Sequence, residues 1–233
     1  MQRARGRHPV PVDYDRDPER FRLARAVLRE YSELADIHGH VAQRLLAEGL
    51  TPVLDVGCGE GELARHLPDG AWVGADTSPE MLARAPEPSV RADATALPFE
   101  DTAFGAVALL YVLYHLPEPR LALAEARRLL RPGGLIAVAA PSRDDSPELA
   151  HALPATPLTF DAELAPGMLA EQFAEVEVER WDAPLLGLPD RGAVRDYLVG
   201  KGVPRDRAAV DAESVQTPLS VTKRGALLFA RRR

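Results

Sequence analysis

Residues 53–61 read VLDVGCGEG, and this stretch decides the fold. A short apolar run leads directly into glycines at positions 57, 59 and 61. An apolar run bounded by glycine is typical of a short buried strand. Glycine directly after a strand permits positive φ and lets the backbone come close to a ligand. The stretch therefore predicts a strand that ends in a ligand-binding loop.

Strand and helix patterns alternate on both sides of this stretch. Helices are predicted from Pro18 onward, at 37–48 up to Gly49, at 62–66, after Ser78 as a helix N-cap, and at 119–130. Strands are predicted at 51–56, 71–75, 89–92, 103–110 and 135–140, with two further strands at 175–181 and 226–230. Strands that alternate with helices predict an α/β fold with a parallel sheet built from right-handed crossovers.

The chain outside the predicted sheet divides into a few segments. Residues 1–17 read as an irregular arm, and 1–48 as an N-terminal arm with a helical cover over a domain at 49–233. Two segments rich in Pro and Gly, 142–158 and 184–217, follow predicted strands. Ligands of open parallel sheets bind outside the carboxyl ends of the strands. We therefore expect these two segments to lie over the site as lids.

Composition excludes several classes of protein. Lys and Arg total 28 against 35 Asp and Glu, and the net charge of −7 argues against a nucleic-acid partner, which usually needs a basic face. The one cysteine, Cys58, excludes an internal disulfide and a cysteine-rich zinc site, and we expect a cytoplasmic location. The N-terminus lacks the apolar run of a secretory signal, and the longest apolar run, 103–116, is too short to span a bilayer. Oligomeric state cannot be read from these features.

Two acidic residues stand at the ends of successive predicted strands. Asp76 ends the second strand, where a carboxylate can accept both hydroxyls of a ribose. Asp93 ends the third strand, where it can accept a hydrogen bond from an adenine amino group. Because the carboxyl ends of parallel strands meet at one edge, both should lie beside the glycine loop. Together they predict a pocket for an adenosine-bearing ligand.

At this point the chain resembles a known family. VLDVGCGEG resembles the first motif of class I S-adenosylmethionine-dependent methyltransferases, with glycine spacing G-x-G-x-G rather than the G-x-G-x-x-G usual in NAD-binding folds. VGADTSPEML (73–82), RADATALPFEDTAF (91–104) and LLYVLYHLPEPRLALAEARRLLRPGG (109–134) resemble the next three blocks in order and spacing. The pattern is nearest to small-molecule methyltransferases of the ubiquinone-biosynthesis type, and it covers about residues 50 to 140 well.

The resemblance implies a fold and a cofactor. The fold would be a Rossmann-like, seven-stranded, mostly parallel sheet with an antiparallel last strand, helices on both faces and an N-terminal helical cover. The cofactor would be S-adenosylmethionine, released as S-adenosylhomocysteine. The residues implied to bind it are Asp55, Gly57, Cys58, Gly59, Asp76, Thr77, Met81, Asp93, Ala94 and the backbone carbonyl of Leu110. We interpret Cys58 as a small side chain that fills space in the loop.

Two positions depart from the family pattern. Gly105 stands where the family commonly has Asp before the fourth strand, and its presence is expected to loosen the entry to that strand. Leu109 and Leu110 stand where small polar residues are frequent, which leaves cofactor contacts there to the backbone.

The acceptor side is less marked in the sequence. Methyl transfer from a sulfonium is an in-line displacement that needs mainly positioning, and a base only where the acceptor must lose a proton. His115 is the candidate catalytic base, with His151 a weaker one, and Tyr14, Tyr31 and Tyr111 are the candidate substrate contacts. The aromatic residues favour an apolar or aromatic metabolite, with oxygen, nitrogen or carbon methylated. No metal site is evident.

Three other functions stay open. The first is methylation of RNA or another macromolecule, which the acidic balance disfavours. The residues after the fourth strand also lack the Pro-Pro-aromatic sequence of amino-directed DNA enzymes. The second is a catalytically inactive protein that still binds S-adenosylmethionine. The third is an NAD-dependent enzyme, which the glycine spacing disfavours.

Overall fold

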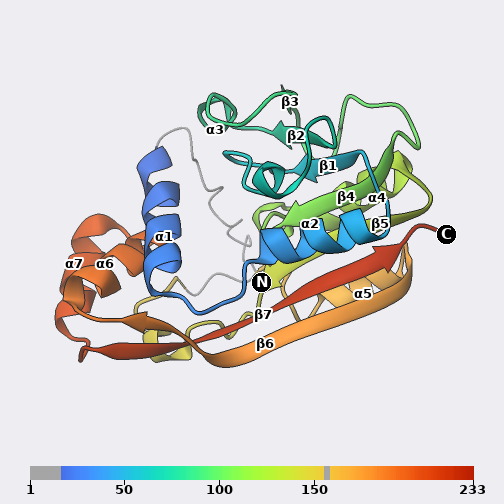
Figure 1. The fold of residues 1–233 in the computed structure, drawn as a ribbon. Helices are drawn as coiled ribbons and strands as arrows, with labels where there is room; N and C mark the ends of the chain where they lie inside the picture. The colour runs from blue at the N-terminus through green and yellow to red at the C-terminus, as the bar shows by residue number, and fades with distance from the viewer. Residues whose placement is uncertain (1–16, 155–157) are drawn as a thin grey trace, which may run out of the picture.

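The computed structural model describes residues 17–154 and 158–233. Its centre is a seven-stranded sheet with the order β3-β2-β1-β4-β5-β7-β6 (Figure 1). The strands are β1 (Val53–Val56), β2 (Trp72–Asp76), β3 (Ser89–Arg91), β4 (Phe104–Leu110), β5 (Leu130–Pro141), β6 (Ala174–Leu188) and β7 (Leu219–Arg231). The first five pair in parallel, whereas β7 runs antiparallel to both β5 and β6. The predicted Rossmann-like sheet with an antiparallel last strand is confirmed.

Ten helical segments surround the sheet in the described part of the chain. The α-helices are α1 (Pro18–Tyr31), α2 (Ile37–Ala47), α3 (Pro79–Leu82), α4 (Pro119–Leu129), α5 (Ala165–Ala170), α6 (Arg191–Gly200) and α7 (Arg205–Glu213). The 3-10 turns are η1 (Leu63–His66), η2 (Leu113–His115) and η3 (Pro147–Leu149). None of the helices within residues 17–154 and 158–233 is long and apolar enough to cross a membrane.

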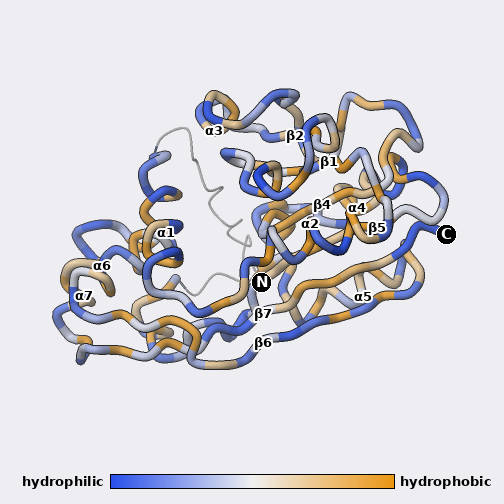
Figure 2. The backbone as a smooth tube through the Cα atoms, viewed as in Figure 1, coloured by the Kyte–Doolittle hydropathy of each residue, from blue (hydrophilic) through white to orange (hydrophobic). Residues whose placement is uncertain are grey.

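Helices cover both faces of the sheet, as predicted. On one face α2 buries Val41 and Leu45 completely, and Figure 1 shows this helix lying across the sheet. On the other face α4 and α5 bury Leu123 and Leu169 in a second cluster. Because β4 is buried along its whole length, its FGAVALL sequence is apolar on both sides. Figure 2 shows the hydrophobic residues concentrated on these central strands.

A third cluster lies at one end of the molecule. There α1 packs against α6, and the outer parts of β6 and β7 extend beyond the parallel strands to meet them (Figure 1). Capping fixes both helix starts, since the Asp17 carboxylate accepts from Arg20 N–H and Asp190 accepts from Ala193 N–H. This end of the fold faces the same edge of the sheet as the glycine loop.

Several boundaries differ from the sequence-based prediction. β6 and β7 are about twice as long as predicted, because their outer halves pair as a two-stranded ribbon with polar residues on it. β5 begins at Leu130, since Pro132-Gly133-Gly134 continues the strand instead of ending the preceding helix in a loop. The helix predicted at 62–66 is only a single 3-10 turn.

Gly105 lies at an irregularity in the pairing of β4 with β5, between Phe104 and Ala106, and it is also tightly packed. A Cβ at this residue would lie 2.9 Å from the backbone of Leu50 and Thr51, and Gly105 N–H donates to Pro52 O at 3.0 Å. Two backbones therefore pass in close contact, which only glycine allows without a shift. The departure from the family pattern is a packing requirement of this chain.

Candidate active site

The glycine loop leaves β1 with its backbone in the left-handed region. Gly57, Gly59 and Gly61 have φ values of +70°, +56° and +79°. A Cβ on Gly57 would lie 2.5 Å from Val112 Cγ2, just beyond the end of β4. Both the φ value and the packing therefore require glycine at position 57. The close contact also fixes the loop against the segment that follows β4.

Asp76 closes the other side of this loop. Its carboxylate accepts from Gly59 N–H at 2.8 Å and from Ser78 N–H at 2.9 Å. Ser78 in turn caps α3 by accepting from Met81 N–H. The carboxylate is thus held at the rim of β2 and directly beside the loop, where the sequence placed it.

Asp55 lies inside the sheet, with 4% of the residue exposed. Trp72 Nε1–H donates to its carboxylate at 3.2 Å. Burial raises the pKa of Asp55 to about 7; the Trp72 hydrogen bond opposes this shift, and the nearby charge of Asp76 adds to it. The protonation state of Asp55 can therefore change near neutral pH. A cation bound at the loop would favour the ionised carboxylate.

The other predicted cofactor residues follow neighbouring strands. Asp93 lies just after β3, and its carboxylate accepts both the N–H and the hydroxyl of Thr95, which lowers its pKa. Met81 and Ala94 are buried, Thr77 is exposed, and Leu110 is the last residue of β4. Since β2 pairs with β3 through Asp76 and Arg91, the two acidic residues lie on adjacent strand ends. The structure brings the predicted residues to one edge.

Two local features of the loop limit what it can offer a ligand. Several of its N–H groups are used internally: Gly57 and Cys58 donate to Ala75 O, and Gly61 donates to Cys58 O. The Cys58 thiol points into the core, since a Cβ on Gly74 would lie 2.8 Å from Cys58 Sγ. Burial raises the thiol pKa, so Cys58 is neutral filler whose side chain faces away from the loop's open side.

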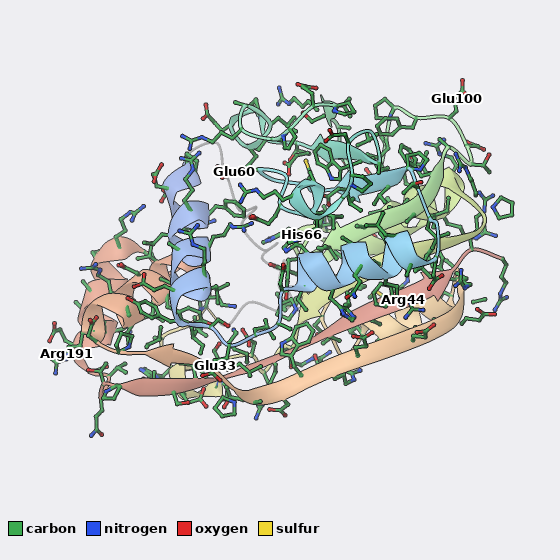
Figure 3. The ribbon with its side chains drawn as sticks, in the orientation of Figure 1. Glu33, Arg44, Glu60, His66, Glu100 and Arg191 are labelled. Carbon is green, nitrogen blue, oxygen red and sulfur yellow. The ribbon has the colours of Figure 1, made fainter. Side chains whose placement is uncertain are left out.

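Helix α1 lies over the glycine loop, which sequence reasoning missed. Arg22 Nε donates to Glu60 Oε1 at 2.9 Å, and Arg25 pairs with Glu62. Figure 3 shows Glu60 on the loop between α1 and the sheet. Phe21 also approaches, because a Cβ on Gly59 would lie 3.5 Å from its ring. In the sequence, the helical spacing of Arg22 and Arg25 indicates only a solvent-exposed helix face.

One donor on α1 is buried beside this loop without an acceptor. Among the described residues, Arg22 Nη2 has no hydrogen-bond partner although it is inaccessible to solvent. A buried guanidinium nitrogen left unpaired costs free energy. An anionic group in the site would remove that cost, because arginine suits carboxylates.

A cavity of about 760 Å³ begins at the carboxyl ends of β4 and β5. Its walls come from α1, the segment after β4, residues 141–154 and 158–164, the end of α6 and β7. The charged or ionisable residues that line it are Arg20, His115, Arg143, Asp144, Asp145, Asp161, Lys201 and Arg224. Val112, which a Cβ on Gly57 would meet, lies two residues before Tyr114 of the cavity wall. The segment after β4 therefore contacts the glycine loop at one residue and lines the cavity a few residues later.

Comparisons with known proteins agree with this geometry. The family described as a methyltransferase domain matches residues 54–138. The chain is 36% identical over 137 residues to the malonyl-[acyl-carrier protein] O-methyltransferase of Dechloromonas aromatica, covering 52% of this chain and 50% of the relative. It is 38% identical over 99 residues to the demethylmenaquinone methyltransferase of Thermus thermophilus, covering 37% and 45%. The matches thus span half or less of these curated relatives.

A solved structure extends the comparison to most of the fold. A Thermotoga maritima protein, described as an S-adenosylmethionine-dependent methyltransferase and possible histamine N-methyltransferase, aligns with a TM-score of 0.65 at 16% identity. The alignment covers 94% of this chain and 98% of that one.

Residues 54–138 thus resemble a methyltransferase domain, and the chain shares the fold of a protein described as an S-adenosylmethionine-dependent methyltransferase.

The residues of the site fit S-adenosylmethionine. Gly57 and Gly59 leave the backbone uncovered, Asp76 could accept from ribose hydroxyls, and Arg22 Nη2 could donate to the methionine carboxylate. In the described part of the chain, no three His, Cys, Asp or Glu side chains gather as metal ligands.

On the acceptor side, the structure separates the predicted residues. Tyr114 and His115 line the cavity, with ring centroids 4.1 Å apart. Tyr111 is partly buried against the cluster that α2 covers, with a φ of +62°, and burial raises its pKa to about 12. Burial also lowers the pKa of His115 to about 4, and the charge of Arg20 adds to this shift. His115 is therefore a neutral ring at pH 7.

The remaining candidates lie elsewhere. Tyr31 packs in the cluster of α1 and α6 rather than on the cavity wall, because it stands at the far end of α1. His151 is exposed on the surface. Tyr14 lies outside the described residues. The cavity also carries arginine, lysine and aspartate, in contrast to the apolar or aromatic pocket expected from the sequence.

Proposed function

We propose that this protein transfers the methyl group of S-adenosylmethionine to a small molecule held in the cavity beside His115. The observation that carries the proposal is the position of this cavity at the end of β5, on the segment after β4 that also contacts the glycine loop through Val112. Its volume of about 760 Å³ suits a metabolite-sized ligand.

The residues divide between the two ligands. Gly57, Asp76, Asp93 and Arg22 would hold the cofactor, which supplies an electrophilic methyl group on a sulfonium. Tyr114 and His115 would form the wall against which the acceptor lies. Catalysis then rests chiefly on positioning the acceptor atom in line with the methyl group.

His115 fits a limited role in proton transfer. With a pKa of about 4, the ring is unprotonated at neutral pH and can accept a proton from the acceptor. The same low pKa gives little driving force, because an effective base has a pKa near the working pH. We therefore propose that His115 first orients the acceptor and only secondarily assists deprotonation.

Cofactor binding is tested first by calorimetry. S-adenosylhomocysteine is titrated into the wild-type protein, into Asp76→Ala and into Glu80→Gln, which alters an exposed carboxylate at the second residue of α3. Asp76→Ala should lose about 1–3 kcal/mol of binding free energy through its charge-assisted hydrogen bonds, and Glu80→Gln should match wild type. Equal affinity of Asp76→Ala and wild type would refute the ribose assignment.

Methyl transfer is tested second. A mixture of small metabolites is incubated with the protein and methyl-labelled cofactor, and labelled products are sought by mass spectrometry. Label in small molecules supports the proposal. Label only in added RNA or protein would favour a macromolecular acceptor. Cofactor binding without any transfer would favour an inactive binding protein.

A further inference from the structure

Lysine is very rare in this chain. It occurs twice, at positions 201 and 223, among 28 lysine and arginine residues. The two lysines lie on different elements, one at the end of α6 and one in the middle of β7. The fold nevertheless brings both ammonium groups to a single carboxylate at the cavity wall.

Asp145 is that carboxylate. Its Oδ2 accepts from Lys223 Nζ at 2.5 Å and from Lys201 Nζ at 2.9 Å, while its Oδ1 accepts from Arg224 N–H at 2.9 Å. The Asp145 side chain is 8% exposed. The cationic partners hold its pKa at about 2 against the opposing effect of burial. The carboxylate therefore stays ionised and cannot turn elsewhere.

Lys223 serves as the support of this arrangement. Besides Asp145, its ammonium donates to Tyr197 OH at 2.8 Å and to Ser146 Oγ at 3.2 Å, and its side chain is 7% exposed. Three donors thus meet three acceptors, as a tetrahedral ammonium requires. An arginine fork would not fit these positions.

Lys201 is placed differently. Its side chain is 34% exposed and lines the cavity. Among residues 17–154 and 158–233, Asp145 is the one hydrogen-bond acceptor of its ammonium. Since an ammonium carries three donors, Lys201 can still donate into the cavity. Two lysines on one carboxylate also leave a single positive charge at this wall.

We propose that Lys201 binds a carboxylate group of the methyl acceptor in this cavity. The inference rests on the proposed function, since it names the substrate class of that same site.

Charge complementarity selects a carboxylate over a dianion. Two neighbouring cations of the wall are already balanced by acids of their own. Arg143 pairs with Asp161 at 2.7 Å, and Arg224 pairs with Asp182 at 2.8 Å. The group of Lys201, Lys223 and Asp145 carries one net positive charge, and the remaining charged wall residues, Arg20 and Asp144, carry opposite charges. One carboxylate therefore neutralises the excess. A phosphate dianion would leave negative charge against Asp145.

The scarcity of lysine makes a direct test available. Protein grown on [ε-¹³C]lysine gives two side-chain signals in a carbon–proton spectrum, and Lys201→Gln identifies which is which. Benzoate, benzamide and phenyl phosphate serve as probes, because the Tyr114–His115 wall can accept a ring. Each probe is titrated with and without S-adenosylhomocysteine.

Benzoate should move the Lys201 signal, leave the Lys223 signal in place, and bind more tightly than either other probe. Lys201→Gln should weaken benzoate by about tenfold, a charge-assisted bond discounted for partial exposure. Arg195→Gln removes one charge from an exposed face of the same helix and should change nothing.

The proposal would be overturned if the Lys201 signal did not shift when benzoate is added, or if it shifted equally with benzamide. Tighter binding of phenyl phosphate than of benzoate would also overturn it. These comparisons use the wild-type protein and stand even if Lys201→Gln folds poorly. The calorimetric titration keeps the two ideas apart. If the cofactor binds but the Lys201 signal does not shift with benzoate, only the carboxylate site is refuted. If the cofactor does not bind but the Lys201 signal shifts with benzoate, only the transferase function is refuted.

Discussion

Replacing Gly57 by any residue with a Cβ would destabilise the folded protein for two separate reasons. Its φ of +70° strains residues with a Cβ, and its contact with Val112 leaves no room for one. At Gly70, with a φ of +76° and no atom within 4 Å of a built Cβ, only the first reason applies. The pair therefore separates backbone strain from steric exclusion at the cofactor loop.

This comparison gives a stability prediction. Gly70→Ala should lower the free energy of unfolding by roughly 1 kcal/mol, and Gly57→Ala by roughly 2–4 kcal/mol, as measured by urea denaturation. Val112→Ala added to Gly57→Ala should recover part of the difference. If Gly57→Ala costs no more than Gly70→Ala, the contact with Val112 is not a constraint.

Asp55 gives a pH-dependent stability. Its pKa is about 7 in the folded protein, raised by burial above the ordinary value of 3.8. Between about pH 4 and 7 the folded state thus binds more protons than the unfolded state, and stability falls as pH rises through this range. Above the folded pKa this contribution no longer changes.

Asp55→Asn removes this titration. Its unfolding free energy, relative to wild type, should increase by on the order of 1–3 kcal/mol from pH 4.5 to pH 7.5. Asp69→Asn, which alters an exposed loop carboxylate, is the matched control for the substitution. A flat difference for Asp55→Asn would show that the buried carboxylate keeps an ordinary pKa.

At the scale of elements, α1 is the part that holds the cofactor loop in place. The Arg22–Glu60 pair is about four-fifths buried on both sides, and Arg25–Glu62 reinforces it one turn later. Pairs of this exposure contribute some tenths to about 1 kcal/mol each and weaken with salt. We infer that α1 covers the cofactor and delays its release.

Replacing Glu60 and Glu62 tests whether α1 covers the cofactor. Glu60→Gln with Glu62→Gln should speed dissociation of S-adenosylhomocysteine by about 3- to 10-fold in stopped-flow measurements at low salt. The difference from wild type should shrink at 1 M salt. Glu213→Gln, which breaks the exposed Arg191 pair between α7 and α6, is the matched control. Unchanged dissociation would mean that α1 does not limit release.

The elements also show what a sequence can predict. Strands β1, β2, β4 and the second half of β5 were predictable because their apolar runs are short, largely buried and punctuated by glycine or proline. The outer half of β7 was not, since it carries Lys223 and Arg224, and only pairing with β6 makes it a strand. The cofactor loop was predictable because its residues are local. The cavity was not, because its walls come from segments as distant as Arg20 and Arg224.

At the scale of the whole molecule, the two sites share one helix. α1 contacts the glycine loop through Arg22 and lines the acceptor cavity through Arg20. It also packs tightly on α6, where a Cβ on Gly200 would lie 2.7 Å from Ala24 Cβ. Gly200 directly precedes Lys201. Ordering of α1 by one ligand should therefore favour the arrangement of α6 that binds the other.

This arrangement predicts positive coupling between cofactor and acceptor. Saturating S-adenosylhomocysteine should tighten benzoate binding by about fivefold, and benzoate should tighten the cofactor product by the same factor, since coupling free energies are reciprocal. Gly200→Ala should reduce the factor by forcing α6 away from α1. Gly187→Ala, with no atom within 4 Å of a built Cβ, should preserve it. Equal benzoate affinities with and without the cofactor product would show that α1 covers two independent sites.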